Sequence, residues 1–206
     1  MNAPKKTSGE RKYHHGDLRR AVKDAALEMA SESGVESISL REVARRIGVT
    51  TAAPYHHFAD RQMLLLELAI EGYSRLLDLL MRARASAVSP EEELRATAIA
   101  YLRFGRKHRA EYAIMFAGEY TKHPRLPELL VIADQCLGLV RESISAMTAL
   151  GETSTAEAAF CVWSLIHGIL QLDQKDVLQE TAAEQERLAV RGVMSIVKGF
   201  VGAKES

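Results

Sequence analysis

The amino-acid sequence predicts an all-α protein. Glycine and proline divide the chain into segments in which apolar residues recur every three to four positions, which is the period of an amphipathic helix. Alternation of apolar and polar residues with a period of two, which is typical of strands, is nearly absent. The chain has 206 residues, of which 47% are hydrophobic and 26% charged, so its composition is that of one large globular domain or two small ones.

The N-terminal residues predict a basic tail followed by a helix. Residues 1–16 are rich in lysine and arginine and poor in apolar side chains, so we expect a flexible tail there. A helix over 17–33 follows, and Gly34 ends it. Its apolar stripe consists of Leu18, Val22, Ala25 and Met29.

The second helix has two start signals. Ser39 and Glu42 have the spacing of a capping box, and Ile38 and Val43 have that of a hydrophobic staple. Gly48 ends this helix, and a short third helix runs to Phe58. We therefore expect two short helices joined by a tight turn.

The rest of the chain predicts six further helices, which brings the total to about nine. Asp60 can cap a long helix that reaches about residue 84. Capping boxes begin at Ser89, Ser154 and Thr181, and proline follows Ser89 at the first helical position. The expected later ranges are 90–107, 109–117, 127–150, 154–173 and 182–201. The apolar stretch 156–172 is interrupted by polar residues, and we expect it to be too short and too polar to span a membrane.

Charge is distributed unevenly along the chain. The 27 basic and 27 acidic residues cancel, which excludes a uniformly basic coat for nucleic acid. Residues 1–62, however, carry eleven Lys or Arg against eight acids, so we expect an anionic partner at this end. Cys136 and Cys161 lack metal-ligand spacing and lie in apolar helical runs, which favours reduced thiols in a cytoplasmic protein without a metal site.

Residues 39–58 have the spacing of a helix-turn-helix. Ala44 is small where the second helix must approach, and Gly48 can take the positive φ of a tight turn. Val49 fills the corner, while Tyr55 and Phe58 anchor the second helix. Such a motif inserts its second helix into the major groove of DNA. An ordinary helical hairpin would show the same spacing, so the pattern alone leaves both interpretations open.

The same residues carry a family resemblance. The DNA-binding segment of TetR-type transcriptional regulators is closely similar to residues 39–65, which read Ser-Leu-Arg-Glu-Val-Ala-Arg-Arg-Ile-Gly-Val-Thr-Thr-Ala-Ala-Pro-Tyr-His-His-Phe-Ala-Asp-Arg-Gln-Met-Leu-Leu. Farther on, Trp163-Ser-Leu-Ile-His167-Gly168 resembles the Trp-His-Gly motif of one C-terminal subgroup of that family. The resemblance implies an all-helical homodimer with a DNA-binding domain over 17–60 and an effector-binding and dimerisation domain over 61–206.

The resemblance also implies which residues contact DNA. The recognition helix would be about Thr51–Phe58, and Pro54 would fix its start because proline is tolerated only in a first turn. Thr51 replaces a lysine that is common in the family, which removes one possible guanine contact. The basic tail could follow phosphates or enter the minor groove, or it could be only a solubilising tail. The expected DNA-binding residues are Arg41, Thr50, Thr51, Ala52, Ala53, Tyr55, His56, His57 and Arg61.

Two further sets of residues belong to the C-terminal region. The family arranges its helices around a cavity, for which we expect the lining Tyr101, Phe104, Tyr112, Met115, Phe116, Phe160, Trp163 and His167, although most of these also fit a plain core. Helices 154–173 and 182–201 carry more apolar surface than one small body can bury, which favours a two-fold partner. The expected interface residues are Val162, Leu165, Ile169, Val193, Ile196 and Phe200.

These observations together predict a dimeric, cytoplasmic DNA-binding transcriptional regulator. We expect a repressor that binds an inverted-repeat operator and is released by a small, largely apolar effector. No nucleotide-binding, metalloprotease or nucleophile-elbow motif is present, so we expect neither an enzyme nor a cofactor. A helical-bundle enzyme that uses His108, His123 or His167 is one alternative. A dimeric adaptor without DNA binding is another, because residues 51–53 lack Lys and Arg.

Overall fold

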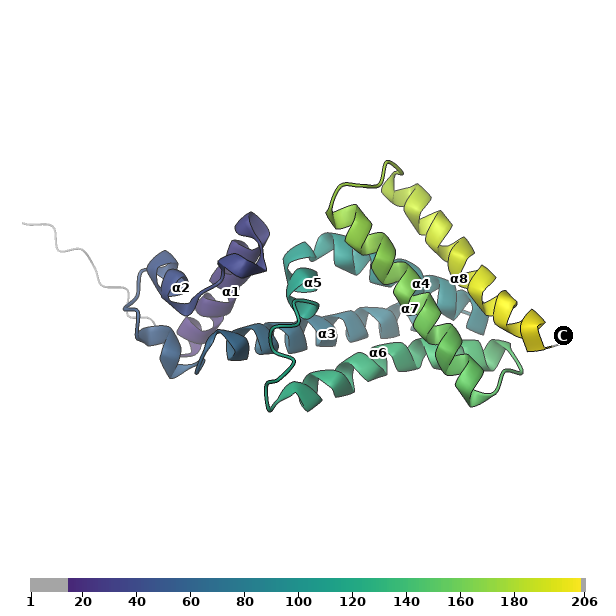
Figure 1. Cartoon of the computed structure of the whole chain (residues 1–206), viewed down its shortest axis with the longest axis horizontal. Helices are drawn as coiled ribbons and strands as arrows, with labels where there is room; N and C mark the ends of the chain where they lie inside the picture. Colours follow the sequence, from purple (N-terminus) through teal and green to yellow (C-terminus); the bar gives the residue numbers. More distant parts are fainter. Residues whose placement is uncertain (1–14, 205–206) are drawn as a thin grey trace, which may run out of the picture. The chain divides into compact units, whose positions relative to one another are not determined.

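The structure is a computed structural model that describes residues 15–204. The expected basic tail lies outside these residues except for its last two positions, which already belong to the first helix. The described residues contain helices and no strand, which confirms the all-α fold class. The elements are α1 (His15–Ser33), η1 (Val35–Ser37), α2 (Leu40–Ile47), η2 (Ala53–His56), α3 (Arg61–Ala85), α4 (Pro90–Lys107), α5 (Arg109–Met115), α6 (Leu126–Met147), α7 (Glu152–Gln174) and α8 (Ala182–Lys204) (Figure 1).

The chain forms two compact units, one up to Arg61 and one from Gln62 onward. In the first unit, α1 packs against α2 and η1, and α2 packs against η2. The core of this unit is small, because each short helix contributes only the side chains of its one apolar face. Its buried side chains include Val22, Ala26, Ile38, Val43, Ala44 and Phe58.

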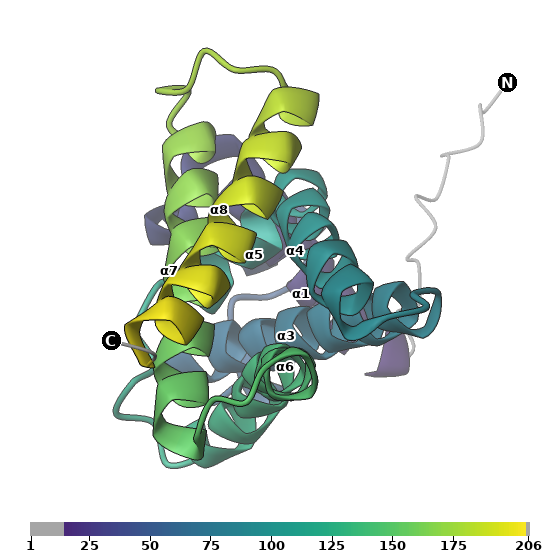
Figure 2. The ribbon, with the colours of Figure 1, turned by 90° about the vertical axis from the view of Figure 1, so that its right-hand side faces the viewer.

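The second unit is a bundle in which α4 packs against α6, α7 and α8. Helices α7 and α8 run alongside each other (Figure 2). Gly105 of α4 lets α7 approach closely, since a Cβ atom at this position would lie 2.5 Å from Cδ1 of Leu170. The core of this unit includes Leu76, Leu94, Leu102, Phe104, Ile144, Val162, Leu170 and Val193.

Most of the predicted helix starts are confirmed. Ser39 caps α2 by accepting the N–H of Glu42 at 3.1 Å, and Ser89 caps α4 in the same way at 3.2 Å. Thr181 and Glu184 form a reciprocal capping box at α8, because each side chain accepts the backbone N–H of the other.

The predicted cap at Ser154 is wrong. Helix α7 begins at Glu152 with Gly151 as its N-cap, and the N–H of Thr155 donates to the Gly151 carbonyl at 3.0 Å. The helix begins two residues earlier and ends one residue later than expected, so it is 23 residues long. By length and composition alone it could cross a membrane, a test that the core helices of soluble bundles also pass. In this structure α7 packs between α6 and α8.

Candidate functional sites

Helix α2 ends in a tight turn at Gly48. The φ of Gly48 is 72° and its ψ is 30°, a left-handed conformation that glycine adopts without strain. Its N–H donates to the carbonyls of Ala44 and Arg45, and the N–H of Val49 donates to Ala44 at 3.0 Å. This turn leads the chain directly from α2 into residues 50–58.

The expected recognition α-helix over Thr51–Phe58 is instead a turn followed by the short 3-10 helix η2. The N–H groups of Ala53, Tyr55 and His57 donate to carbonyls three residues earlier, at 3.0 to 3.1 Å. Pro54 has no N–H and cannot make the bond to the residue four positions earlier that an α-helix requires. Pro54 therefore not only lies in the first turn, as expected, but also favours a 3-10 helix over an α-helix.

Residues 50–58, which we call the recognition segment, have a buried and an exposed face. Pro54 and Phe58 are buried in the first unit, and the Arg19 guanidinium lies 5.3 Å from the centre of the Phe58 ring. Pro54 and Phe58 thus anchor the segment, whereas Tyr55, which was expected to anchor it as well, is 48% exposed and lies on the solvent side. The exposed members of the predicted DNA-binding set are Arg41, Thr50, Thr51, Ala52, Tyr55 and His56.

Three predicted DNA-binding residues have surroundings that the sequence did not indicate. Ala53 and His57 are only half exposed, and Nε2 of His57 is buried without a hydrogen-bond partner among residues 15–204. Arg61, expected to contact phosphate, donates from Nε to the Ile38 carbonyl at 2.6 Å and from Nη2 to the Val35 carbonyl at 2.8 Å. Its guanidinium thus connects the start of α3 to the backbone on either side of η1.

The other arginines of α2 are paired within the first unit. Arg45 donates from Nε to Glu42 at 3.0 Å, and Arg46 donates from Nη1 to Glu32 at 2.8 Å. The ion pair with Arg46 lowers the pKa of the Glu32 carboxyl below its usual value. Arg41 is exposed and has no ion pair with any residue in 15–204, so its charge is available to a partner.

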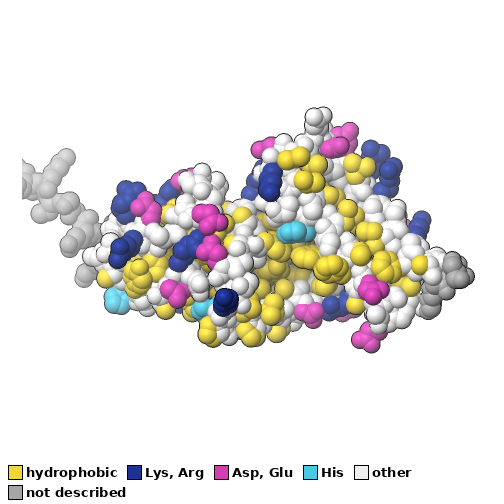
Figure 3. Space-filling view, viewed as in Figure 1, with side chains coloured by type: hydrophobic (Ala, Val, Ile, Leu, Met, Phe, Trp, Pro, Cys, Tyr) yellow, Lys and Arg dark blue, Asp and Glu magenta, His cyan; other side chains and the backbone are white. Residues whose placement is uncertain are grey.

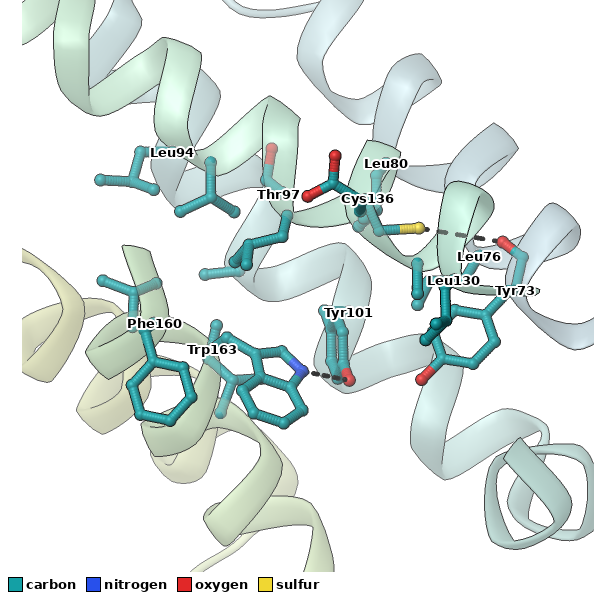
Figure 4. A pocket seen from close by; sticks show the side chains of 17 residues that line it. Tyr73, Leu76, Leu80, Leu94, Thr97, Tyr101, Leu130, Cys136, Phe160 and Trp163 are labelled. Atoms are coloured by element: carbon teal, nitrogen blue, oxygen red, sulfur yellow. Dashed lines mark hydrogen bonds between the residues drawn. The ribbon is translucent and has the colours of Figure 1, made fainter. Parts of the chain in front are cut away.

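The second unit contains a cavity of about 470 Å³ between α3, α4, α6 and α7. Figure 4 shows the side chains around it, with Tyr101 and Trp163 on one side and Tyr73 and Leu130 on another. Three of the predicted lining residues, Tyr101, Phe160 and Trp163, belong to its wall. Most of the remaining wall is aliphatic, formed by Leu76, Leu80, Leu94, Ala98, Leu130, Ala133, Leu137, Val140, Val162 and Ile166.

Five of the predicted lining residues, Phe104, Tyr112, Met115, Phe116 and His167, do not line this cavity. They pack beside it around α5, which fills the space between α3 and α7. Met115 packs so closely on α3 that a Cβ atom at Gly72 would lie 2.8 Å from its sulfur. Phe104 is buried and stacks on the ring of His108.

Contacting aromatic side chains extend from the wall of the cavity to α5. The indole nitrogen of Trp163 donates to the hydroxyl of Tyr101 at 3.3 Å, and the Tyr101 ring packs edge-on against the Tyr112 ring, with 6.1 Å between ring centroids. The Tyr112 hydroxyl lies 2.6 Å from Nδ1 of His167. Burial lowers the pKa of His167 below its ordinary value, which favours the neutral ring, and raises the pKa of Tyr101 to about 12. His167 is therefore a core histidine with a satisfied partner.

Sequence reasoning missed the contribution of α3 and α6 to the cavity. Tyr73, Leu76 and Leu80 of α3 face it, and so does Cys136 of α6. The spacing of the three α3 residues, three and then four positions apart, is a helical stripe that the sequence contains. That stripe cannot show whether it faces a packed core or an open cavity, because both require the same apolar side chains.

The predicted interface residues differ in their exposure. Val162 and Val193 are completely buried within the subunit, so neither can contribute surface to a partner, and Val162 lines the cavity instead. The other four are half-buried and pack against the core of their own subunit: Leu165, Ile169, Ile196 and Phe200. They do so because α7 and α8 cover each other on this side. Hydrophobic side chains remain uncovered along α7 on the face seen in Figure 3.

Residues 94–196 match the family described as tetracyclin repressor-like, C-terminal domain, and residues 23–68 match the family described as bacterial regulatory proteins, tetR family. The chain is 24% identical over 182 residues to the uncharacterized HTH-type transcriptional regulator YobS of Bacillus subtilis, which covers 87% of this chain and 92% of the relative. A solved structure of a protein with unknown function from Rhodococcus sp. RHA1 is 30% identical, with a TM-score of 0.75, and covers 93% of this chain and 100% of that one. The TetR family regulator PfmR from Thermus thermophilus is 21% identical, with a TM-score of 0.68 over 86% of this chain and 97% of that one, which shows a common fold.

Proposed function

Since this chain belongs to the TetR family of bacterial regulatory proteins, we propose that it is a homodimeric repressor that a small, largely apolar effector releases from an inverted-repeat operator. DNA-binding transcriptional regulation is the function common to the family and to the relatives that the chain matches. Residues 17–60 would form the DNA-binding domain, and residues 61–206 would bind the effector and the second subunit. The description of the C-terminal family as repressor-like supports repression.

The observation that carries the proposal is the exposed face of the recognition segment. Thr50 and Thr51 directly follow the Gly48 turn, at the end of the segment that would enter the major groove first. The exposed methyl group of Ala52 can contact thymine methyl groups, and Tyr55 and His56 can bond bases or phosphates. Arg41 adds a free positive charge for the backbone.

The proposed dimer rests on an apolar strip that the subunit leaves uncovered. On α7 the strip runs through Phe160, Cys161, Ser164, Gly168 and Leu172, and Leu188 continues it on α8. Apart from the neighbouring backbone of α7 itself, no atom of the described residues lies within 4 Å of a Cβ built at Gly168, so packing among them does not require glycine there. A partner helix that crosses closely would require it. A two-fold axis through this strip would relate two recognition segments, which calls for an inverted-repeat site.

Release by an effector rests on the cavity and on α3. The helix begins at Arg61, directly after the recognition segment, and its side chains Tyr73, Leu76 and Leu80 line the cavity. A ligand that displaces these side chains would shift a helix that continues into the DNA-binding residues. A coupling of about 1–3 kcal/mol would release most of the protein from its operator.

Three finer features are part of the same proposal. Trp163, His167 and Gly168 lie within the matched C-terminal region, which supports membership of the subgroup with the Trp-His-Gly motif. We expect action in the cytoplasm, where the DNA is. We also expect no cofactor and no catalytic turnover, since both matched families are described as regulators.

Selection of bound fragments from genomic DNA, followed by fluorescence anisotropy, tests DNA recognition. Tyr55→Ala should weaken binding to the selected fragment by about 1–3 kcal/mol, while Val88→Ala, at a site 89% exposed in the second unit, should not change it. Failure of the wild-type chain to enrich any fragment would favour an adaptor without DNA binding.

Sedimentation tests the dimer. Leu188 is 39% exposed in the subunit, so Leu188→Glu should fold normally but leave an unpaired carboxylate in the interface, at a cost of several kcal/mol. The variant should sediment as a monomer at micromolar concentration, whereas Val88→Glu should remain a dimer. An intact Leu188→Glu dimer would show that the interface lies elsewhere.

A further inference from the structure

The lining of the effector cavity carries almost no charge. Among the residues that the structure describes around it, Asp134 is the only carboxylate, and there is no lysine, arginine or histidine. Asp134 is itself 68% exposed at the edge and is bound to Arg141 at 2.8 Å. An ionised ligand would therefore lose its hydration without meeting an opposite charge, and burial of an unpaired charge is strongly unfavourable.

Most polar groups in the cavity wall already have partners. The Thr97 hydroxyl donates to the Glu93 carbonyl at 2.7 Å, and the Tyr101 hydroxyl accepts from Trp163. The Cys136 thiol lies 3.9 Å from the backbone carbonyl of Tyr73. These groups have little remaining capacity for a ligand, because their hydrogen bonds would have to be broken first.

The hydroxyl of Tyr73 is the exception. It makes no hydrogen bond with any other residue in the described part of the chain. Figure 4 shows it at the end of the ring that points toward the same region of the cavity as the hydroxyl of Tyr101. Burial raises the pKa of Tyr73 well above its usual value, so this phenol stays protonated and can donate. A donor in an apolar cavity gains free energy when a ligand supplies the missing acceptor.

We propose that the effector is an electrically neutral molecule, apolar over most of its surface, with an acceptor oxygen (alcohol, carbonyl or ether) that the Tyr73 hydroxyl binds. This inference rests on the proposed function, because it names the ligand class of the effector cavity. The volume of about 470 Å³ lies within the range of pockets that enclose small organic ligands.

The position of this donor on α3 connects ligand chemistry with control. The Tyr73 ring packs edge-on against Phe116, with 5.9 Å between ring centroids, and its carbonyl faces Cys136 of α6. A ligand bound to the Tyr73 hydroxyl therefore acts on the helix that continues from the recognition segment. An apolar molecule without an acceptor would fill the same space but would leave this donor unsatisfied.

Three probes of equal length and different charge test the ligand class: 1-decanol, decanoate and decylammonium, each at pH 7 and below its aggregation limit. Trp163 is the only tryptophan and lines the cavity, so its emission reports binding. Decanol should bind with a dissociation constant at least about tenfold lower than those of the two ions, because only the ions lose charge hydration on entry.

Removal of the Tyr73 hydroxyl tests whether this group binds the ligand. Tyr73→Phe should weaken decanol binding about two- to tenfold, the value of one hydrogen bond, and should not change the weak binding of decylammonium, which has no acceptor for the hydroxyl. Tyr120→Phe is the matched control, since its buried hydroxyl donates to the Ile114 carbonyl outside the cavity, and it should leave decanol affinity unchanged. Thermal unfolding identifies any variant that is not folded.

The outcomes separate this inference from the proposed function. If decanoate or decylammonium binds as tightly as decanol, or if no probe changes Trp163 emission, the neutral ligand class is wrong. If Tyr73→Phe binds decanol like the wild type, Tyr73 is not the anchor. None of these results would affect binding of the selected DNA fragment by the ligand-free protein, and that measurement tests the proposed function by itself.

Discussion

Replacement of Arg61 by alanine distinguishes a structural arginine from a phosphate contact. The side chain is half-buried and donates two hydrogen bonds, at 2.6 and 2.8 Å, to the carbonyls of Ile38 and Val35. A hydrogen bond that involves a charged group contributes about 1.5–3 kcal/mol, and water can replace part of it at a half-buried site. We therefore expect Arg61→Ala to lower the free energy of unfolding of the first unit by about 2–4 kcal/mol.

Urea denaturation followed by far-ultraviolet circular dichroism measures this loss, and anisotropy at several salt concentrations measures DNA binding. Arg41→Ala is the matched control, because Arg41 is exposed and has no ion pair in the described chain. It should leave unfolding unchanged and reduce the salt slope of DNA binding by about one. Arg61→Lys should remain destabilised, since one ammonium group cannot match the planar fork of a guanidinium.

The opposite pattern would refute this reasoning. If Arg61→Ala unfolds at the wild-type urea concentration and reduces the salt slope as Arg41→Ala does, Arg61 contacts phosphate and its two carbonyl bonds contribute nothing measurable. The prediction for Arg61 that the sequence supported would then be correct after all.

Three further predictions concern the second unit. Tyr112→Phe removes the hydroxyl that lies 2.6 Å from Nδ1 of His167, and urea unfolding should show a loss of about 1–3 kcal/mol. Because burial lowers the pKa of His167 from 6.5, the unfolded chain takes up its proton first as pH falls. The contribution of His167 to the free energy of unfolding should therefore be complete above pH 6.5 and decline below it. In His167→Gln, the free energy of unfolding measured from pH 7.5 to 5 should decline less steeply. Gly168→Leu should leave the subunit folded, since no described residue outside the adjoining backbone of α7 lies within 4 Å of a Cβ there, but it should weaken the dimer in sedimentation. An unchanged dimer would place Gly168 outside the interface.

Much of the fold could be predicted from the sequence because helix ends are local. A capping bond joins residues three positions apart, as between Ser39 and Glu42, and a left-handed glycine such as Gly48 ends a helix whatever packs around it. The position and length of α4 followed from Ser89 and Pro90 for the same reason. The sequence also predicts the position of the recognition segment, because its residues are contiguous. It predicts an α-helix there, however, and not the 3-10 helix that Pro54 favours.

The sites depended on contacts between residues far apart in the chain. A stripe of apolar residues does not reveal which neighbour will cover it, so Val162 and Leu165 looked alike in sequence, yet only Val162 is buried and lines the cavity. The sequence predicts a phosphate contact for Arg61, but it cannot show that the side chain donates to two carbonyls more than twenty residues away. Helix α5 fills one side of the second unit and leaves the cavity to α3, α4, α6 and α7. Sequence periodicity determines which face of a helix avoids water, but only the packing of several helices together decides whether that face meets a side chain, an empty space or a second subunit.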